Sequence, residues 1–223
     1  MKNKLPLILI GGGVLIILLA VFVIVRSLKS TTPKGQDEVE NVPELSQSQW
    51  PAVSLTPVTD PKIPNSLGHL LGLKVQGIKV AGAETMDYLL VYSTSDGGQQ
   101  GVPGTVKLTG ADIDRNLLLG SESSGKFRFD AGVKQGTITI TFRNGNGKTL
   151  GKLSTDFHLQ SDETPLTSID GKFSYDLEKP SKGVFFVTMN TFIQPSTPSY
   201  VVWQNGYGVF ASDGKPHAGT VSQ

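Results

Sequence analysis

The sequence contains no cysteine among its 223 residues, and this absence excludes several classes of site at once. Without thiols the chain can form neither disulfides nor thiolate nucleophiles, and it cannot hold cysteine-ligated zinc or iron–sulfur clusters. Charged residues are also scarce, at 17% of the chain, whereas there are 26 glycines and 13 prolines. This composition favours many short elements joined by turns over long solvated helices, and so favours a mainly β protein.

A clustered positive charge is lacking as well. From residue 35 onward the chain has 15 basic and 19 acidic residues, which gives that part a net charge near −4. A nucleic-acid-binding protein needs a concentrated basic surface to displace counterions from phosphates. We therefore expect no nucleic-acid partner.

Recognisable catalytic motifs are missing too. Beyond loose matches, the sequence has no G-x-S-x-G elbow, Walker loop, dinucleotide fingerprint or S-x-x-K arrangement. The three histidines, His69, His158 and His217, are far apart, and none belongs to a metal-spaced pair such as H-x-x-x-H. His158 is expected to point outward from a strand. We predict that the protein is not an enzyme, with no catalytic, cofactor-binding or metal-ligating residues and no cofactor.

Two acidic pairs come nearest to a calcium site. They are Asp112 with Asp114, and Asp162 with Glu163, but neither lies in an Asp-x-Asp-x-Asp-Gly loop. Capping of a turn explains isolated aspartates equally well. The glycine-rich segment 95–101 follows a strand but opens no helix, so we interpret it as a hairpin loop and not as a phosphate cradle.

The longest hydrophobic run is residues 5–25, which carry no charge and are rich in Leu, Ile and Val. As a helix this run would span about 31 Å, close to the thickness of a bilayer's hydrocarbon core. We predict a single-pass signal-anchor helix that contacts the lipid bilayer through residues 5–25. Gly11, Gly12 and Gly13 would let another helix approach closely and form a helix contact.

Two other interpretations of this segment remain open. A cleaved signal peptide would have a shorter apolar region and a small-x-small cleavage site, and Val25-Arg26-Ser27-Leu28-Lys29 offers none. A type IV pilin would also place a glycine before a hydrophobic helix, as in Gly13-Val14, but the early glutamate of pilins is missing.

The basic residues that flank the segment nearly balance, with Lys2 and Lys4 on one side and Arg26, Lys29 and Lys34 on the other. Flanking charge therefore does not decide the orientation. The short positive N-terminus and the Ser/Thr/Gly-rich remainder favour a location at the cell membrane, with the N-terminus on the inner side and the C-terminal domain on the outer side.

Composition divides the chain into four parts. We expect a transmembrane anchor over 1–29, a Pro/Ser/Thr-rich stalk over 30–66, a β-sandwich body over 67–212 and a flexible tail over 213–223. Two small or intertwined sandwiches are the alternative to one body. Within the body we predict strands over 73–80, 88–94, 105–109, 126–129, 137–142, 148–159, 172–177, 184–192 and 200–203.

Two of these segments give clear patterns. Residues 137–142 alternate strictly between threonine and an apolar residue, and Asn144-Gly145-Asn146-Gly147 follows with the composition of a tight turn, which predicts a hairpin. Residues 184–192 have apolar side chains of both parities and predict a central strand covered on both faces. Segments 63–73 and 111–119 could each hold a helical turn.

The sequence also echoes itself, since Gly125-Lys126-Phe127-Arg128-Phe129-Asp130 resembles Gly171-Lys172-Phe173-Ser174-Tyr175-Asp176. Together with Thr-Ile-Thr-Ile-Thr-Phe, Asn-Gly-Lys and Gly-Val-Phe-Phe-Val, residues 136–192 resemble bacterial immunoglobulin-like or fibronectin type III-like accessory modules. This resemblance implies an immunoglobulin-like β-sandwich body. It also implies a role in adhesion, spacing or envelope assembly.

Aromatic residues concentrate near the C-terminus, where Tyr200, Trp203 and Tyr207 lie close in sequence. Aromatic faces beside amides can stack on sugar rings or form a protein contact, so these three residues are a candidate binding surface for a protein or glycan of the envelope. The alternative is a strand pair whose aromatics fill the core.

These observations favour a membrane-anchored extracytoplasmic β-sandwich protein that acts as a binding or structural module at the cell surface. An accessory subunit of a membrane or pilus-like assembly is the second hypothesis. The third is a cell-envelope hydrolase with an unrecognised acidic site, which would require a pocket that brings Asp or Glu side chains together.

Overall fold

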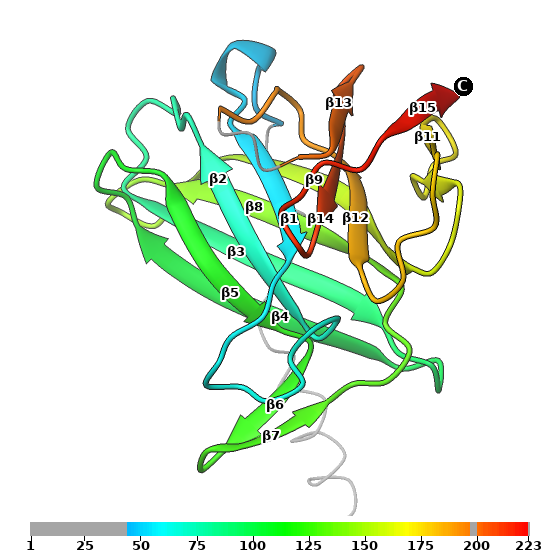
Figure 1. The fold of residues 1–223 in the computed structure, drawn as a ribbon. Helices are drawn as coiled ribbons and strands as arrows, with labels where there is room; N and C mark the ends of the chain where they lie inside the picture. Colours follow the sequence, from blue (N-terminus) through cyan, green and yellow to red (C-terminus); the bar gives the residue numbers. More distant parts are fainter. Residues whose placement is uncertain (1–43, 197–199, 223) are drawn as a thin grey trace, which may run out of the picture. The chain divides into compact units, whose positions relative to one another are not determined.

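The computed structural model describes residues 44–196 and 200–222, and these fold almost entirely as antiparallel β-strands (Figure 1). The predicted mainly β fold is thus confirmed; among the described residues the only helical element is a 3-10 turn, η1 (Gln47–Gln49). The largest sheet has seven strands in the order β13 (Val202–Gln204), β14 (Tyr207–Ala211), β12 (Phe185–Asn190), β9 (Thr149–Ser161), β8 (Gln135–Arg143), β3 (Thr85–Ser93) and β4 (Gln99–Lys107).

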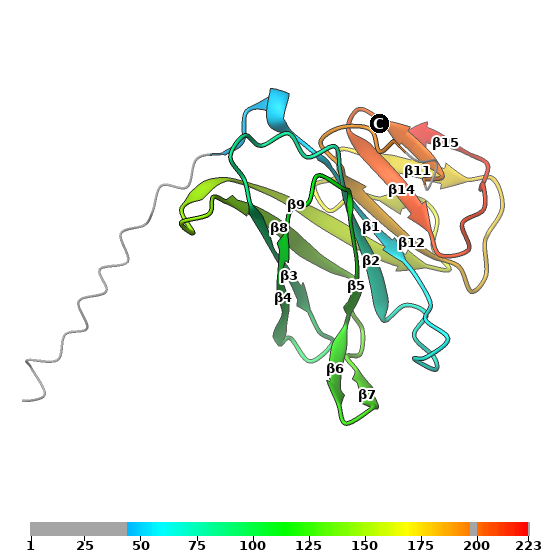
Figure 2. The ribbon, with the colours of Figure 1, turned by 90° about the vertical axis from the view of Figure 1, so that its left-hand side faces the viewer.

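A three-stranded sheet of β1 (Ala52–Pro57), β2 (Leu70–Gln76) and β5 (Ile113–Leu118) covers one face of this large sheet. Figure 2 shows the two sheets as stacked layers. Their facing side chains form the first core, in which Leu55, Leu73, Leu90, Phe142 and Phe157 are completely buried. Burial of each such side chain stabilises the fold by roughly 1.5–3 kcal/mol, so this core holds the two layers together.

A second three-stranded sheet covers the opposite face of the large sheet near β12 and β14. It consists of β10 (Leu166–Thr167), β11 (Ser174–Leu177) and β15 (Gly219–Ser222). Alternation along β12 explains the two cores, because Val187 and Met189 point into the first core while Phe186 points into the second. The prediction of a central strand covered on both faces is confirmed.

The predicted hairpin joins β8 to β9. Ile138, Ile140 and Phe142 are buried in the first core, and the threonines between them face the other side of the sheet. Asn144 closes the turn, since its side-chain oxygen accepts hydrogen bonds from the backbone N–H groups of Asn146 and Lys148. The alternation and the turn residues therefore specify this hairpin together.

Two predicted boundaries differ from the structure. The range given to the stalk contains β1, whose Val53 and Leu55 are fully buried and which pairs with β2 along its length. The range given to the flexible tail contains β15, which pairs with β11. Trp50 also docks on the body, because its ring packs against the first core and meets Phe192 edge to face. The described residues from 44 to 222 belong to one compact unit with two cores.

The segment 111–119, which we expected to hold a helical turn, forms strand β5 instead. Ile113 and Leu117 face the first core while the residues between them are exposed, and β5 pairs with β2. Segment 63–73 contains turns and the start of β2, and no helical turn. In both segments strand pairing, which a local pattern does not encode, decides the conformation.

The two similar segments occupy different places in the fold. The first forms β7 (Lys126–Phe129), which pairs only with β6 (Gly120–Ser123) in a hairpin that projects from the bottom of Figure 1. The second leads into β11, the middle strand of the small sheet. The sequence echo is therefore no repeated structural unit.

The predicted anchor, residues 5–25 with Gly11, Gly12 and Gly13, lies outside the described residues. Within 44–196 and 200–222, no helix has the length and apolar character needed to cross a membrane. The anchor thus stays a prediction from sequence.

Candidate functional site

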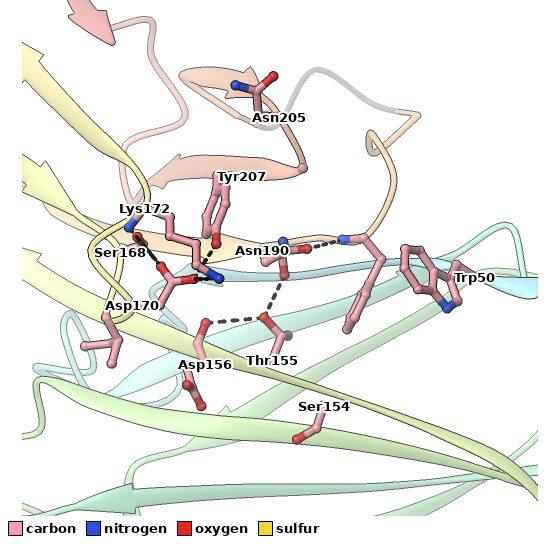
Figure 3. Close-up of a pocket in the computed structure, with 13 residues that line it drawn as sticks. Trp50, Ser154, Thr155, Asp156, Ser168, Asp170, Lys172, Asn190, Asn205 and Tyr207 are labelled. Carbon is pink, nitrogen blue, oxygen red and sulfur yellow. Dashed lines mark hydrogen bonds and ion pairs between the residues drawn. The ribbon is translucent and has the colours of Figure 1, made fainter. Parts of the chain in front are cut away.

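A cavity of about 750 Å³ opens at the edge of the small sheet, over the face of the large sheet that points away from the first core (Figure 3). Its lining combines hydroxyl, amide, carboxylate, ammonium and aromatic groups. The lining residues are Trp50, Ser154, Thr155, Asp156, Ser168, Ile169, Asp170, Lys172, Asn190, Phe192, Asn205, Gly206 and Tyr207.

Three neighbouring strands supply the floor. Asn190, the last residue of β12, pairs with Tyr207, the first residue of β14. On its other side β12 pairs with β9, where Met189 lies opposite Phe157. Asp156 precedes Phe157, so its side chain points to the face opposite the buried phenylalanine. Strand pairing thus gathers Asp156, Asn190 and Tyr207 on one face.

The wall of the cavity is the turn between β10 and β11, and Asp170 fixes its shape. Its carboxylate accepts hydrogen bonds from the hydroxyl of Ser168 at 2.6 Å and from the backbone N–H of Lys172 at 3.2 Å. It also accepts a hydrogen bond from the phenol of Tyr207, and the ammonium of Lys172 lies 3.7 Å away. Figure 3 shows these groups converging on Asp170. The carboxylate is therefore a structural anchor whose acceptor positions are largely used.

The pKa shifts of Asp170 and Tyr207 agree with this role. Burial acts to raise the pKa of Asp170, but hydrogen bonds from Ser168, Tyr207 and Lys172 and the charge of Lys172 outweigh it and lower the pKa below its usual value. Burial and the bond to Asp170 raise the pKa of Tyr207 to about 12. At neutral pH the pair is thus a carboxylate and a neutral phenol that donates to it.

Aromatic rings frame the cavity at two places. Trp50 and Phe192 meet edge to face, with ring centroids 5.5 Å apart, while the ring of Tyr207 stacks on Phe173 at 5.6 Å. Both pairs hold a lining aromatic in a fixed orientation. Rigid aromatic faces beside hydrogen-bonding groups are suited to a ligand that has both apolar and polar faces.

A smaller cavity of about 270 Å³ adjoins the first. It lies over β3 and β8 and shares Asp156 and Ile169 with the larger cavity. The open face of the sheet continues along β8 and β9, where the hydroxyls of Thr137 and Thr139 point outward and bond to Asp156 and Ser154. The two cavities form adjoining subsites over a hydroxyl-rich surface.

Of the three aromatic residues predicted as a binding surface, only Tyr207 lines either of these cavities. Trp203 is half-buried, and its indole N–H donates to the hydroxyl of Thr191 at 2.9 Å. Tyr200 packs against the first core, and its hydroxyl accepts a hydrogen bond from the amide of Gln194. The structure therefore separates Tyr207 from its two neighbours in sequence.

The structure also shows where the three histidines lie. His69 stacks on Phe129 at 4.6 Å, and its pKa is lowered because burial outweighs the influence of Asp130. His158 points away from the first core as expected, but β10 covers it, since its Nδ1 lies 2.8 Å from the carbonyl of Thr167. His217 lies in the segment between β14 and β15.

The acidic pairs are engaged in local contacts. Asp112 accepts hydrogen bonds from Gln76 and from the backbone of Gly77, and Asp114 lies 4.0 Å from the ammonium of Lys74. Asp162 accepts a bond from Gly183, while Glu163 pairs with Lys134 at 3.6 Å. Across the part of the chain that the structure describes, no group of three or more His, Asp or Glu side chains could hold a metal ion.

Sequence reasoning missed most of the cavity, including Asp156, Asp170, Asn190 and Asn205. Two signals were available: Asn205-Gly206 has the composition of a tight turn, and the even positions of β9 are polar from Lys152 to His158. Neither signal says which segments meet.

Comparison with protein-family models, curated proteins and solved structures gives no match to this chain.

Proposed function

We propose that this protein is a membrane-anchored binding module that holds a glycan in the cavity over β9, β12 and β14, outside the cytoplasm. The observation that carries the proposal is the lining itself, in which two carboxylates, two amides, hydroxyls and an ammonium lie beside rigid aromatic rings. Sugars present both hydroxyls and an apolar ring face, so they match such a lining better than a lipid or a purely ionic ligand does.

The size of the cavity supports an oligosaccharide ligand. Ligand sites in proteins range from about 300 to 1,000 Å³, and the cavity of about 750 Å³ lies within this range. The adjoining subsite of about 270 Å³ offers room for a further sugar unit along the same sheet face. A glycan chain would thus cross from the Trp50 end over Asp156 toward Gly136.

The charge distribution favours a neutral ligand. Asp170 is neutralised by Lys172 at 3.7 Å, which leaves Asp156 as the remaining carboxylate of the lining. Asp156 also accepts a hydrogen bond from Thr137 at 2.6 Å. A single partly engaged carboxylate is a good acceptor for sugar hydroxyls and a poor partner for polyanions.

The same contacts argue against an acidic hydrolase at this cavity. Two carboxyl groups with different tasks are needed for glycoside hydrolysis, one of them protonated as a general acid. Asp170 accepts hydrogen bonds from Ser168, Lys172 and Tyr207, which favour its ionised form. Asp170 therefore serves to shape the site, and binding without hydrolysis is the activity that the lining supports.

The remaining features complete the proposal. An anchor at residues 5–25 would fix the protein in the cell membrane with its N-terminus inside, and residues 30–43 would act as a short stalk. The antiparallel packing of the sheet β1–β2–β5 on the large sheet is compatible with the immunoglobulin-like accessory module that residues 136–192 resemble. Such a protein would present the cavity to glycans of the cell envelope.

An array of immobilised oligosaccharides tests this function. The full chain is solubilised in a polyoxyethylene detergent, because detergents with sugar headgroups would compete for the cavity. We expect the chain to be retained on at least one glycan. Asp156→Ala should bind at least tenfold more weakly, because it removes a charged acceptor whose hydrogen bond contributes roughly 1.5 kcal/mol or more. Asn205→Gly should also weaken binding, since it removes an amide while keeping the positive φ of 51° at this position.

A matched control is Asn116→Ala, because Asn116 is exposed on β5, in the other layer of the sandwich. This variant should bind as the wild type does. Failure of the folded wild-type chain to bind any glycan of the array would contradict the proposal, and equal loss in the Asn116 variant would show that the cavity is not responsible.

A further inference from the structure

A second cluster of polar side chains lies outside the glycan cavity, where two loops meet beside the small sheet. Nδ1 of His217 lies 2.9 Å from the hydroxyl oxygen of Ser181, and its Nε2 lies 3.0 Å from a carboxylate oxygen of Asp213. Ser181 belongs to the loop before β12, while Asp213 and His217 belong to the loop before β15. The fold thus joins a hydroxyl, an imidazole and a carboxylate in one line of hydrogen bonds.

We propose that Ser181 is a nucleophile that cleaves small acyl esters, with His217 as its general base and Asp213 as the residue that orients the imidazole. This activity goes beyond glycan binding and uses a different surface of the protein. It rests on the geometry of the three residues and on the cleft next to them.

The hydrogen bonds fix the chemistry of the imidazole. A carboxylate can only accept, so the Asp213 contact places the ring proton on Nε2 and leaves the lone pair of Nδ1 directed at Ser181. The nitrogens exchange the places they have in the best-known serine hydrolases, where serine contacts Nε2 and the acid contacts Nδ1. Because the ring is conjugated, either nitrogen can serve as the base once the other is held by a carboxylate.

The surroundings hold this arrangement in place. Burial acts to raise the pKa of Asp213, but hydrogen bonds from His217 and the Lys215 backbone, with the charges nearby, lower it, so the residue stays ionised. Phe186 packs edge to face on the His217 ring at 5.0 Å. The hydroxyl of Tyr175 donates to the His217 carbonyl at 2.8 Å and fixes the backbone.

A cleft of about 210 Å³ lies at the serine and the histidine. Its lining is Glu178, Lys179, Ser181, Pro216, His217 and Ala218. This volume suits a short acyl group such as acetyl. The backbone N–H of Lys182, next to the serine, donates to no backbone carbonyl among the described residues, and the N–H that follows a nucleophilic serine commonly stabilises the oxyanion.

The reaction needs only water as co-reactant. The Ser181 oxygen forms a bond to the ester carbonyl carbon while His217 takes its proton, and the bond to the alcohol then breaks as His217 returns that proton to the leaving oxygen. Water repeats both steps on the acyl-serine. The products are the free carboxylic acid, the alcohol and the regenerated serine.

Labelling of the full chain with a fluorophosphonate probe tests this proposal, because such probes react with activated serines. Mass spectrometry should find one adduct, on Ser181, and hydrolysis of 4-nitrophenyl acetate should fall to background in Ser181→Ala. His217→Gln should slow labelling about 100-fold, the low end of the range for loss of a general base. Asp213→Asn should slow it as well, and Asp213→Glu should restore part of the rate.

Ser123→Ala is the matched serine control, because Ser123 is exposed on the β6–β7 hairpin, and it should label as the wild type does. The decisive observation is made on the folded wild-type chain, so the proposal can be contradicted even where a variant does not fold. An unlabelled Ser181 would overturn it, and so would a labelling rate that His217→Gln leaves unchanged. Either result would leave the proposed glycan binding untouched.

Discussion

Tyr207 and Asp170 lie 37 residues apart in the chain, yet the phenol of Tyr207 donates a hydrogen bond to the Asp170 carboxylate. This contact ties the start of β14 to the turn between β10 and β11, and so joins the floor of the glycan cavity to its wall. The cavity therefore depends on how the small sheet docks on the large one.

Replacement of Tyr207 by phenylalanine should reveal this contact through its pH dependence. Because hydrogen bonds depress the pKa of folded Asp170, its contribution to stability is present above its unfolded pKa of 3.8 and is lost as the pH falls through the lower, folded value. Tyr207→Phe should therefore be less stable by about 1 kcal/mol at neutral pH.

The difference between wild type and Tyr207→Phe should shrink as the pH drops below about 4. Urea unfolding of both proteins at several pH values measures this. A difference that stays constant down to about pH 2 would mean that the phenol does not stabilise the ionised carboxylate.

Arg143 links the outer face of the large sheet to the β8–β9 turn. Its Nε donates to Asp87 at 2.6 Å, and its Nη1 donates to the hydroxyl of Thr149 at 2.8 Å. We expect Arg143→Ala to lower the free energy of unfolding by about 1–2 kcal/mol, because charge-assisted bonds to two strands are lost. Lys74→Ala, which removes an exposed ion pair of 4.0 Å, is the control and should change stability by less than about 0.5 kcal/mol.

Trp203 distinguishes a packing role from a binding role. Its indole N–H bond to Thr191 would be lost in Trp203→Phe, which should lower stability by about 1 kcal/mol and leave glycan affinity unchanged. Thermal melting and array binding of the same sample measure both effects. Weaker binding with an unchanged melting curve would return Trp203 to the binding surface that the sequence predicted.

The predicted anchor is tested by extraction of membranes with alkaline carbonate. An uncleaved helix over residues 5–25 should keep the full chain in the membrane pellet, and a variant that lacks residues 1–29 should be released. Protease added to intact cells should digest the C-terminal body. A body that is cut only after lysis would place it inside the cell and contradict the proposed orientation.

The sequence predicted correctly those strands and turns that are specified by their own residues. The alternation of residues 137–142 and the Asn-Gly turn specified β8 and its hairpin, and apolar side chains of both parities revealed that β12 is covered on both faces. In contrast, β1 was missed because it has only six residues, with Pro51 directly before it and Pro57 as its last residue. Its identity as a strand comes from pairing with β2 and burial against the large sheet.

The candidate sites were harder to predict for the same reason. Asp156, Asn190 and Tyr207 meet because β12 pairs with β9 on one side and with β14 on the other. Ser181 and His217 meet because β11 pairs with β15 and brings two loops together. A single sequence indicates which segments favour strands, but it does not show which strands are neighbours.

The two tryptophans of the chain provide the most direct test of the glycan site. Trp50 lines the cavity and Trp203 does not, and each indole N–H gives its own signal in a nitrogen-15 NMR spectrum, with Trp203→Phe identifying which is which. Addition of the glycan that binds best on the array should shift the Trp50 signal in a saturable manner and leave the Trp203 signal in place. Saturable binding that shifts Trp203 and leaves Trp50 unmoved would contradict the location of the site.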